Sequence, residues 1–260
     1  MDQTAHPVPA LHPPLPVAEV AALAARYRRA NSGVMAMLNR IGTRAEAQMA
    51  ALPAELHGRV LATTESALSA AYGLAGLGAA LPPMGQRGAM ALAVGTGAVG
   101  GFGGMATAVA ELPVTVTLIL RAIREVAAEH GFDPEEPAMR RETPRVLGAR
   151  SPMAADDGVN SAFIGARRTL TGPALQRMIA MVAPRLAATL GQKLAAQAVP
   201  VLGAVAGAGL NAAYMRYFRE MAAVRFGLLR LAQRHDPVEV LAVFRAEAAR
   251  DVTRGRGPGA

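Results

Sequence analysis

The sequence predicts an all-α fold, a compact multi-helix bundle with Gly- and Ala-rich helices at its centre. Apolar residues recur at helical spacing through most of the 260 residues, and no segment shows the alternation typical of a strand. Residues 88–120 and 194–215 contain a single charge between them, which suits helices that are buried on all sides. The hydrophobic content of 52% is sufficient for a sizeable core.

The positive charge of the chain is carried almost entirely by arginine. There are 27 basic and 19 acidic residues, giving a formal charge of +8, and Lys193 is the only lysine. Guanidinium groups suit bidentate contacts with phosphate or carboxylate. Aromatic residues are 4% of the chain and tryptophan is absent, so the stacking platforms of single-stranded nucleic-acid binders are missing. We therefore expect a membrane surface or membrane protein as partner, through anionic lipid or a transporter component, and no nucleic acid. Purely solubilising charge is the alternative.

Cysteine is absent, which excludes disulfides, thiol catalysis and cysteine zinc sites and fits a reducing compartment. Residues 1–16 are rich in Pro and His and contain no apolar segment, so they are predicted to be a disordered lead and not a signal peptide. Residues 17–250 are predicted to form one helical domain, and residues 251–260 a disordered basic tail. We expect a cytoplasmic protein that lies peripherally on the inner face of the cell membrane.

The first elements are predicted from apolar spacing and from the prolines and glycines that interrupt it. A helix is expected over residues 17–30, with arginines near its end, where cations suit the helix dipole. Further helices are expected over residues 32–52 and 53–72, the latter with Pro53 in its first turn. Glycines and the pair Pro82–Pro83 then predict a loop or tight corner over residues 73–87.

The later elements follow from the same signals. Pro113 predicts the early turn of a helix that ends at Gly131. Four prolines in the polar segment 133–163 predict one or two short helices joined by loops. The remaining helices are expected over residues 173–197, 199–225 continuing to 234, and 237–249. Both uncharged stretches are richer in Gly and Ala than typical membrane spans, so we interpret them as helices buried in a bundle. Reversible insertion of a hairpin and docking beside a transporter are the alternatives.

The glycines of the first uncharged stretch permit two interpretations. Gly95, Gly97 and Gly100 match the dinucleotide-binding pattern GxGxxG. The second strand and terminal acid of a Rossmann unit do not follow, so close helix packing is favoured and no cofactor is expected. The glycines expected to permit that packing are Gly97, Gly100, Gly101, Gly104, Gly203 and Gly207.

No catalytic template is present. The chain has no GxSxG, HExxH or Walker pattern, and its five histidines are not at metal-ligand spacing, so no catalytic residue and no metal site are predicted. A hydrolase assembled from distant residues is the alternative function. The polar residues that could form such a site between helices are Glu111, Arg121, Asp156, Asp157, Asn160 and Asn211.

Glu111 is the only charge in residues 88–120. A carboxylate in so apolar a segment is costly unless it is paired or lies at a helix N-terminus, so helix capping is the preferred role. The alternative is a buried polar site in which Glu111 meets Arg121, Asn211 or the pair Asp156 and Asp157. The acidic pair together with Asn160 is itself interpreted as an N-cap with first-turn acids.

Three segments resemble the EcsC family: ELPVTVTLILRAIREVAAEHGFD at 111–133, VLGARSPMAADDGVNSAF at 146–163 and KLAAQAVPVLGAVAGAGLNAAYMRYFREMAAVRFGLLRL at 193–231. The similarity covers about residues 20–248 in the family's order. It implies a helical protein whose family takes its name from a gene beside an ABC-transporter operon, and it implies no specific chemistry beyond a possible peptidase role. Arg216, Tyr217 and Arg225 stand where the family pattern is more acidic or contains histidine, and Pro144 stands where it is helical.

Overall fold

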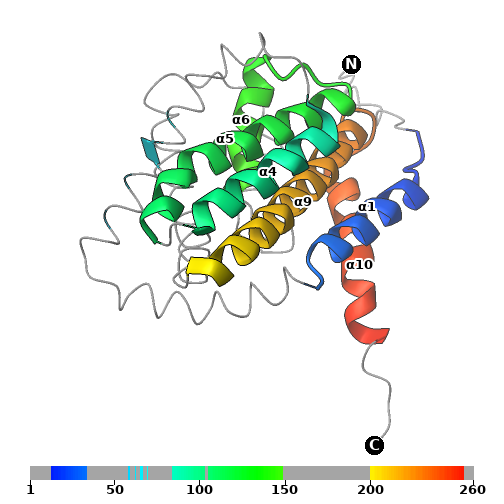
Figure 1. Ribbon diagram of the computed structural model, residues 1–260. Coiled ribbons are helices and arrows are strands. Elements are labelled where there is room, and N and C mark those ends of the chain that lie inside the picture. The colour runs from blue at the N-terminus through cyan, green and yellow to red at the C-terminus, as the bar shows by residue number, and fades with distance from the viewer. Residues whose placement is uncertain are drawn as a thin grey trace, which may run out of the picture.

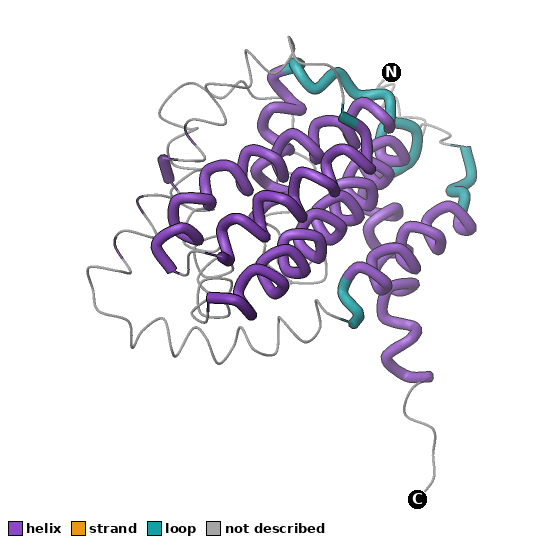
Figure 2. The backbone as a smooth tube through the Cα atoms, in the orientation of Figure 1, coloured by secondary structure: helices purple, strands orange, loops and turns teal. Residues whose placement is uncertain are grey.

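All regular secondary structure in the described part of the chain is helical. The computed structural model describes residues 13–33, 84–102, 105–148 and 200–254, with residues 58, 62, 65, 66 and 69 between them. These residues form helices and no strand, which confirms the predicted all-α class (Figure 2). The helices are α1 (Val17–Ala30), α4 (Gly85–Phe102), α5 (Met105–Glu129), α6 (Pro137–Gly148), α9 (Pro200–Ala232) and α10 (Pro237–Arg254).

Three long helices, α4, α5 and α9, pack against one another and form the centre of the bundle (Figure 1). The helices α4 and α5 form an antiparallel hairpin, because Gly100 lies beside Glu111 while Met84 is hydrogen-bonded to Glu125. Helix α9 runs parallel to α5 and antiparallel to α4. The predicted Gly- and Ala-rich central helices are therefore α4 and the first half of α9.

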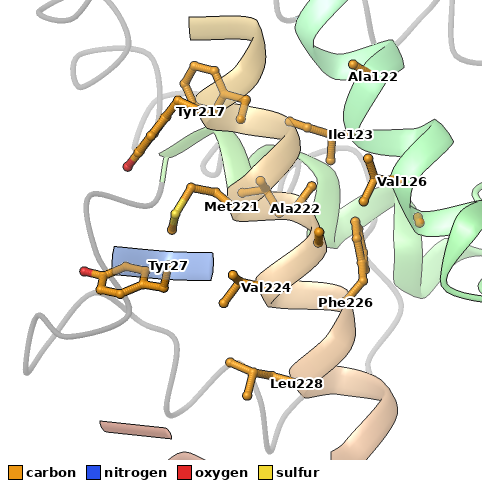
Figure 3. Packing of buried hydrophobic residues seen from close by; sticks show 14 of the residues in the cluster. Tyr27, Ala122, Ile123, Val126, Tyr217, Met221, Ala222, Val224, Phe226 and Leu228 are labelled. Carbon is orange, nitrogen blue, oxygen red and sulfur yellow. The ribbon is translucent and has the colours of Figure 1, made fainter. Parts of the chain in front are cut away.

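The remaining helices pack around the second half of α9. Helices α1 and α10 pack against each other and against α9, and α6 packs against α5 and α9 (Figure 1). Large side chains fill this region: Phe226 and Phe244 are fully buried, and the ring of Tyr27 meets Phe244 edge-on with centroids 5.8 Å apart. Figure 3 shows Ile123 and Val126 of α5 beside this part of α9. The aromatic and aliphatic core thus lies at one end of α9, and the small-residue packing lies at the other.

Ion pairs link α6 and α5 to α9. The carboxylate of Glu142, 1% exposed, accepts hydrogen bonds of 2.9 and 2.7 Å from Arg225 and one of 2.6 Å from Arg145. Arg219, also on α9, donates over 2.8 Å to Glu129 of α5, whose side chain is largely exposed. Removing one partner of the buried Glu142–Arg225 pair would leave an uncompensated buried charge, which costs about 3–5 kcal/mol. These pairs therefore specify how the helices are oriented around α9.

The start of α4 is capped from the neighbouring helix. Gly85, the first residue of α4, has φ +63°, a left-handed conformation that favours glycine. The backbone N–H of Met84 donates to the Glu125 carboxylate of α5 over 3.0 Å. A carboxylate at a helix N-terminus satisfies a free donor and complements the dipole.

Several predicted boundaries differ from the observed ones. The predicted loop over residues 73–87 overlaps the start of α4, and α5 begins at Met105, so Pro113 lies inside the helix and not in its early turn. Helix α10 continues through Arg254, past the predicted boundary at residue 251. One short helix, α6, occupies part of the proline-rich segment and includes Pro144. After Pro113, buried residues such as Val116 and Ile119 hold α5 in the core, so tertiary packing outweighs the local signal of proline there.

The predicted helices over residues 32–52 and 173–197 lie outside the described residues. Within the described part, α1 confirms the prediction for residues 17–30, and α9 joins the segments expected over residues 199–234 into one helix. None of the described helices combines the length and the apolar character that a membrane span needs.

The buried tyrosines of α9 make stability sensitive to alkaline pH. Burial, with a smaller contribution from Tyr27, raises the pKa of Tyr217 from 10.0 to about 12, and burial also raises the pKa of Tyr214. A group whose pKa is higher in the folded state contributes stability below its unfolded pKa and loses that contribution as the pH rises. Between pH 10 and about pH 12 the folded protein should therefore lose stability.

We expect Tyr217→Phe to lose less stability than the wild type over this pH interval, because phenylalanine keeps the ring packing without an ionisable hydroxyl. Urea unfolding midpoints at pH 8 and at several points up to pH 12 measure the effect. At pH 8, where the hydroxyl is neutral in both states, the difference between the two proteins should be small. Equal losses of stability in the variant and the wild type would show that ionisation of Tyr217 is not the cause.

Candidate functional site

A buried polar cluster lies where α4, α5 and α9 meet. It contains Thr96 from α4, Glu111 and Thr115 from α5, and Asn211 from α9. Glu111 is 8% exposed and Asn211 is 2% exposed. Buried polar groups inside an apolar interface are stable only when they are hydrogen-bonded, so the contacts of this cluster determine how the three helices fit together.

Glycines create the space that this cluster occupies. A Cβ atom added to Gly97 would lie 2.7 Å from the carbonyl carbon of Gly207 and 2.8 Å from Nδ2 of Asn211. A Cβ atom at Gly100 would lie 2.9 Å from Cδ of Glu111. The two glycines therefore serve different contacts: Gly97 lets the α4 and α9 backbones approach, and Gly100 makes room for the carboxylate.

The carboxylate of Glu111 joins α5 to α9. Its Oε1 accepts a hydrogen bond of 2.6 Å from the amide of Asn211 and another of 2.6 Å from the hydroxyl of Thr115. Thr115 lies one turn after Glu111 and so projects from the same face of α5. The Asn211 amide also lies 3.4 Å from the hydroxyl of Thr96, which donates to the Ala93 carbonyl. Hydrogen bonds to an ionised group are the stronger class, which offsets part of the cost of burying it.

The preferred prediction for Glu111, helix capping, is wrong. Helix α5 begins at Met105, so Glu111 lies inside the helix, where backbone N–H groups are already bonded within the helix. The structure instead places it beside Asn211, the arrangement named as the alternative. Arg121 is ten residues further along α5, about 15 Å at the usual helical rise, and pairs with Glu125 over 3.4 Å.

The other predicted residues have different outcomes. Gly101 and Gly203 lie within α4 and α9, but their surroundings are not among the described contacts. Gly104 and the predicted residues of the polar middle segment lie outside the described residues; these are Asp156, Asp157 and Asn160.

Sequence reasoning missed the threonines of the cluster and the acidic residues that bind arginine. Thr96 lies four residues before Gly100, and Thr115 lies four residues after Glu111, so each pair shares one face of a helix. This spacing is visible in the sequence but is too common in helices to identify a cluster. Glu142 and Arg225 are far apart in the sequence and become partners only because α6 packs on α9.

The described residues assemble no recognisable catalytic or metal centre. The ring Nδ1 of His130 lies 2.8 Å from the Val126 carbonyl, and that of His235 lies 2.9 Å from the Pro13 carbonyl, so both rings are held by backbone. Within the described ranges, no group of three or more His, Asp or Glu side chains is placed to hold a metal ion. The polar cluster is therefore best understood first as a hydrogen-bonded link between three helices.

Comparison with known proteins finds a match of part of the chain to one family model and no match to a solved structure. Residues 45–147 match the model of the EcsC protein family. This segment contains α4, α5 and most of α6, including Gly97, Gly100 and Glu111, whereas Gly207 and Asn211 lie outside it. No curated protein and no solved structure matches the chain.

We expect Gly97→Ala to destabilise the protein, because the added methyl group meets backbone atoms of α9 that cannot move independently. Overpacking of this kind costs about 1–3 kcal/mol. Gly95→Ala is a matched control in the same helix, because a Cβ atom there meets nothing within 4 Å. The control should be neutral or gain up to about 1 kcal/mol from helix propensity. Thermal unfolding of both variants measures the difference, and equal melting temperatures would refute the close approach.

We expect Asn211→Asp to destabilise by about 3–5 kcal/mol at neutral pH, because it places a second buried carboxylate against Glu111 without a donor between them. The double variant Glu111→Gln with Asn211→Asp restores a donor and an acceptor in exchanged positions, so it should recover most of the loss. A double-mutant cycle by urea unfolding measures this coupling. Additive losses in the double variant would show that the two side chains do not interact.

Proposed function

We propose that this protein, whose residues 45–147 match the EcsC family model, is a membrane-associated accessory protein of that family that docks on an anionic membrane surface through the outer face of α4. The family name is linked to an ABC transporter, as the resemblance in the sequence implies, which makes a membrane the expected setting. The proposal places the protein on the cytoplasmic side of that membrane.

The observation that carries this proposal is the apolar character of both sides of α4. The inner side consists of small buried residues, Ala89, Ala93, Gly97 and Gly100. The outer side exposes Ala91, Leu92, Val94, Gly95 and Val99, and Val99 is 73% exposed. A contiguous exposed apolar surface is typical of an interaction site with a protein or a membrane.

Arginine supplies the electrostatic part of the proposed contact. Arg87 projects from the first turns of α4 on the same outer side, is exposed, and forms no ion pair with the described residues. The chain as a whole has a formal charge of +8. Basic residues near a membrane surface each contribute about 1 kcal/mol of attraction to anionic lipid. Charge complementarity therefore favours an anionic bilayer over a neutral one as the occupant of this face.

The alternative function, a hydrolase, receives no support from the described residues. Of its proposed polar residues that can be placed, Glu111 and Asn211 are buried between helices, and Arg121 pairs with Glu125. Both described histidines are bonded to backbone carbonyls. The membrane proposal instead uses the exposed outer side of α4 and requires no catalytic group.

The proposal predicts binding to vesicles that contain phosphatidylglycerol, weaker binding to pure phosphatidylcholine vesicles, and release as salt is raised. Exposed charges are screened over about 8–10 Å near physiological ionic strength, so the arginine contribution should fall with salt. Co-sedimentation with vesicles measures it. Val99→Asp and Arg87→Glu should each reduce binding several-fold, because they remove the apolar and the charged part of the contact.

Val238→Asp and Arg234→Glu are the matched controls, since they change an exposed valine of α10 and an exposed arginine beyond the end of α9. Both controls should bind like the wild type. Equal losses in the controls, or unchanged binding of Val99→Asp, would exclude α4 as the contact. Salt-sensitive binding to duplex DNA without binding to vesicles would overturn the membrane proposal in favour of nucleic acid.

A further inference from the structure

Two exposed arginines lie at the same level of the bundle, one on α4 and one on α9. The backbones of these antiparallel helices cross at Gly97 and Gly207. Arg87 lies ten residues before Gly97, and Arg216 lies nine residues after Gly207. Both arginines are therefore displaced in the same direction, by about 14–15 Å along the helix axes at the usual rise. Both are exposed, and within the described part of the chain neither forms an ion pair.

Beyond these arginines the three central helices carry almost no charge. Residues 88–120 contain Glu111 as their only charge, and residues 194–215 contain none. The Glu111 carboxylate is buried and accepts hydrogen bonds from Asn211 and Thr115, so it faces the interior of the bundle. The uncharged section therefore comprises α4 after Arg87, the first half of α5 and the first part of α9.

Each of the three helices exposes a valine in this section. Val99 of α4 is 73% exposed, Val205 of α9 is 77% exposed and Val114 of α5 is 46% exposed. Val99 and Val205 lie beyond the crossing of α4 and α9, on the side away from the arginines. The end of α4, the start of α5 and the start of α9 lie together at this end of the bundle (Figure 1). Exposed apolar surface on several helices is typical of a site that contacts a membrane or a protein.

The length of the uncharged section matches one leaflet of a bilayer. From Arg87 to Val99 there are twelve residues, which span about 18 Å in a helix. The hydrocarbon core of a bilayer is about 30 Å thick, so one leaflet contributes about 15 Å. None of the described helices could cross the whole core. Helices satisfy their own backbone groups, which hydrocarbon requires, and the long side chains of arginine can reach lipid phosphates from its edge.

We propose that this end of the bundle enters one leaflet of an anionic phospholipid membrane, with Val99 and Val205 in the hydrocarbon and Arg87 and Arg216 on lipid phosphates. The inference rests on the proposed membrane association and gives its orientation. The axis of α4 is tilted into the leaflet, and α9 enters with it. A contact through α4 alone would instead lie flat on the surface.

Fluorescent probes at single cysteines test this orientation. The chain contains no cysteine, so each introduced cysteine carries the only label. Val99→Cys, Val205→Cys, Ala91→Cys and the control Val238→Cys change exposed residues, and an NBD label at each reports its surroundings. Vesicles of phosphatidylglycerol and phosphatidylcholine carry spin-labelled lipids that quench either deep in the leaflet or near the head groups.

Probes at Val99 and Val205 should be quenched more strongly by the deep spin label, and the probe at Ala91 by the shallow one. The probe at Val238 should remain in water. A probe at Val205 that stays in water, or equal depths at Val99 and Ala91, would overturn the tilted orientation and leave the membrane proposal standing. Failure of the unlabelled protein to bind the vesicles would overturn both.

Charge variants of α9 provide a second measurement by co-sedimentation. Val205→Asp and Arg216→Glu should each reduce binding several-fold, whereas Val238→Asp and Arg234→Glu should bind like the wild type. The substitutions lie at exposed positions, and an unchanged Tm shows that each variant is folded. Wild-type binding by both α9 variants would restrict the contact to α4 and overturn the inference.

Discussion

The structure depends on the close approach of α4 and α9 at Gly97 and Gly207. At this crossing no side chain separates the two backbones, and the Asn211 amide beside it reaches across to the Glu111 carboxylate of α5. The glycines and the polar pair therefore require each other: a larger residue would separate the helices, and separated helices would leave a buried carboxylate and amide without partners. Loss of the polar contacts would cost about 3–5 kcal/mol, a large fraction of the roughly 5–15 kcal/mol by which native proteins are stable.

The rest of the bundle uses a different kind of packing. Around the second half of α9, large side chains such as Phe226 and Phe244 supply the buried area, and buried pairs such as Glu142 with Arg225 determine which helix packs where. Apolar burial contributes roughly in proportion to area, whereas the buried pairs contribute mainly to specificity of arrangement. Helix α9 thus connects two regions. In its first half, small residues allow contacts between backbones, and in its second half large side chains make the contacts.

This division explains why α4 is the element that connects structure with proposed function. Its inner side is made of Ala and Gly, so its stability in the bundle comes from close approach and from the polar cluster, together with the Glu125 cap at its start. Its outer side is then free to carry apolar residues that face away from the core. The proposed membrane contact and the buried polar cluster lie on opposite sides of this helix, so contacts in the cluster hold in place the surface that would dock.

The sequence by itself determined the helical class, the ends of α1, the role of Gly97 in close packing and the unusual position of Glu111, because these depend on local spacing and on the cost of a charge in an apolar segment. It did not determine the start of α5 or the role of Glu111, because Pro113 is a strong local signal that the tertiary packing of α5 outweighs. The partners Asn211 for Glu111 and Arg225 for Glu142 were decided by tertiary structure, since they lie 100 and 83 residues apart in the chain. Hydrogen bonding acts over a few ångströms of space, and only the packing of α4, α5, α6 and α9 brings those residues that close.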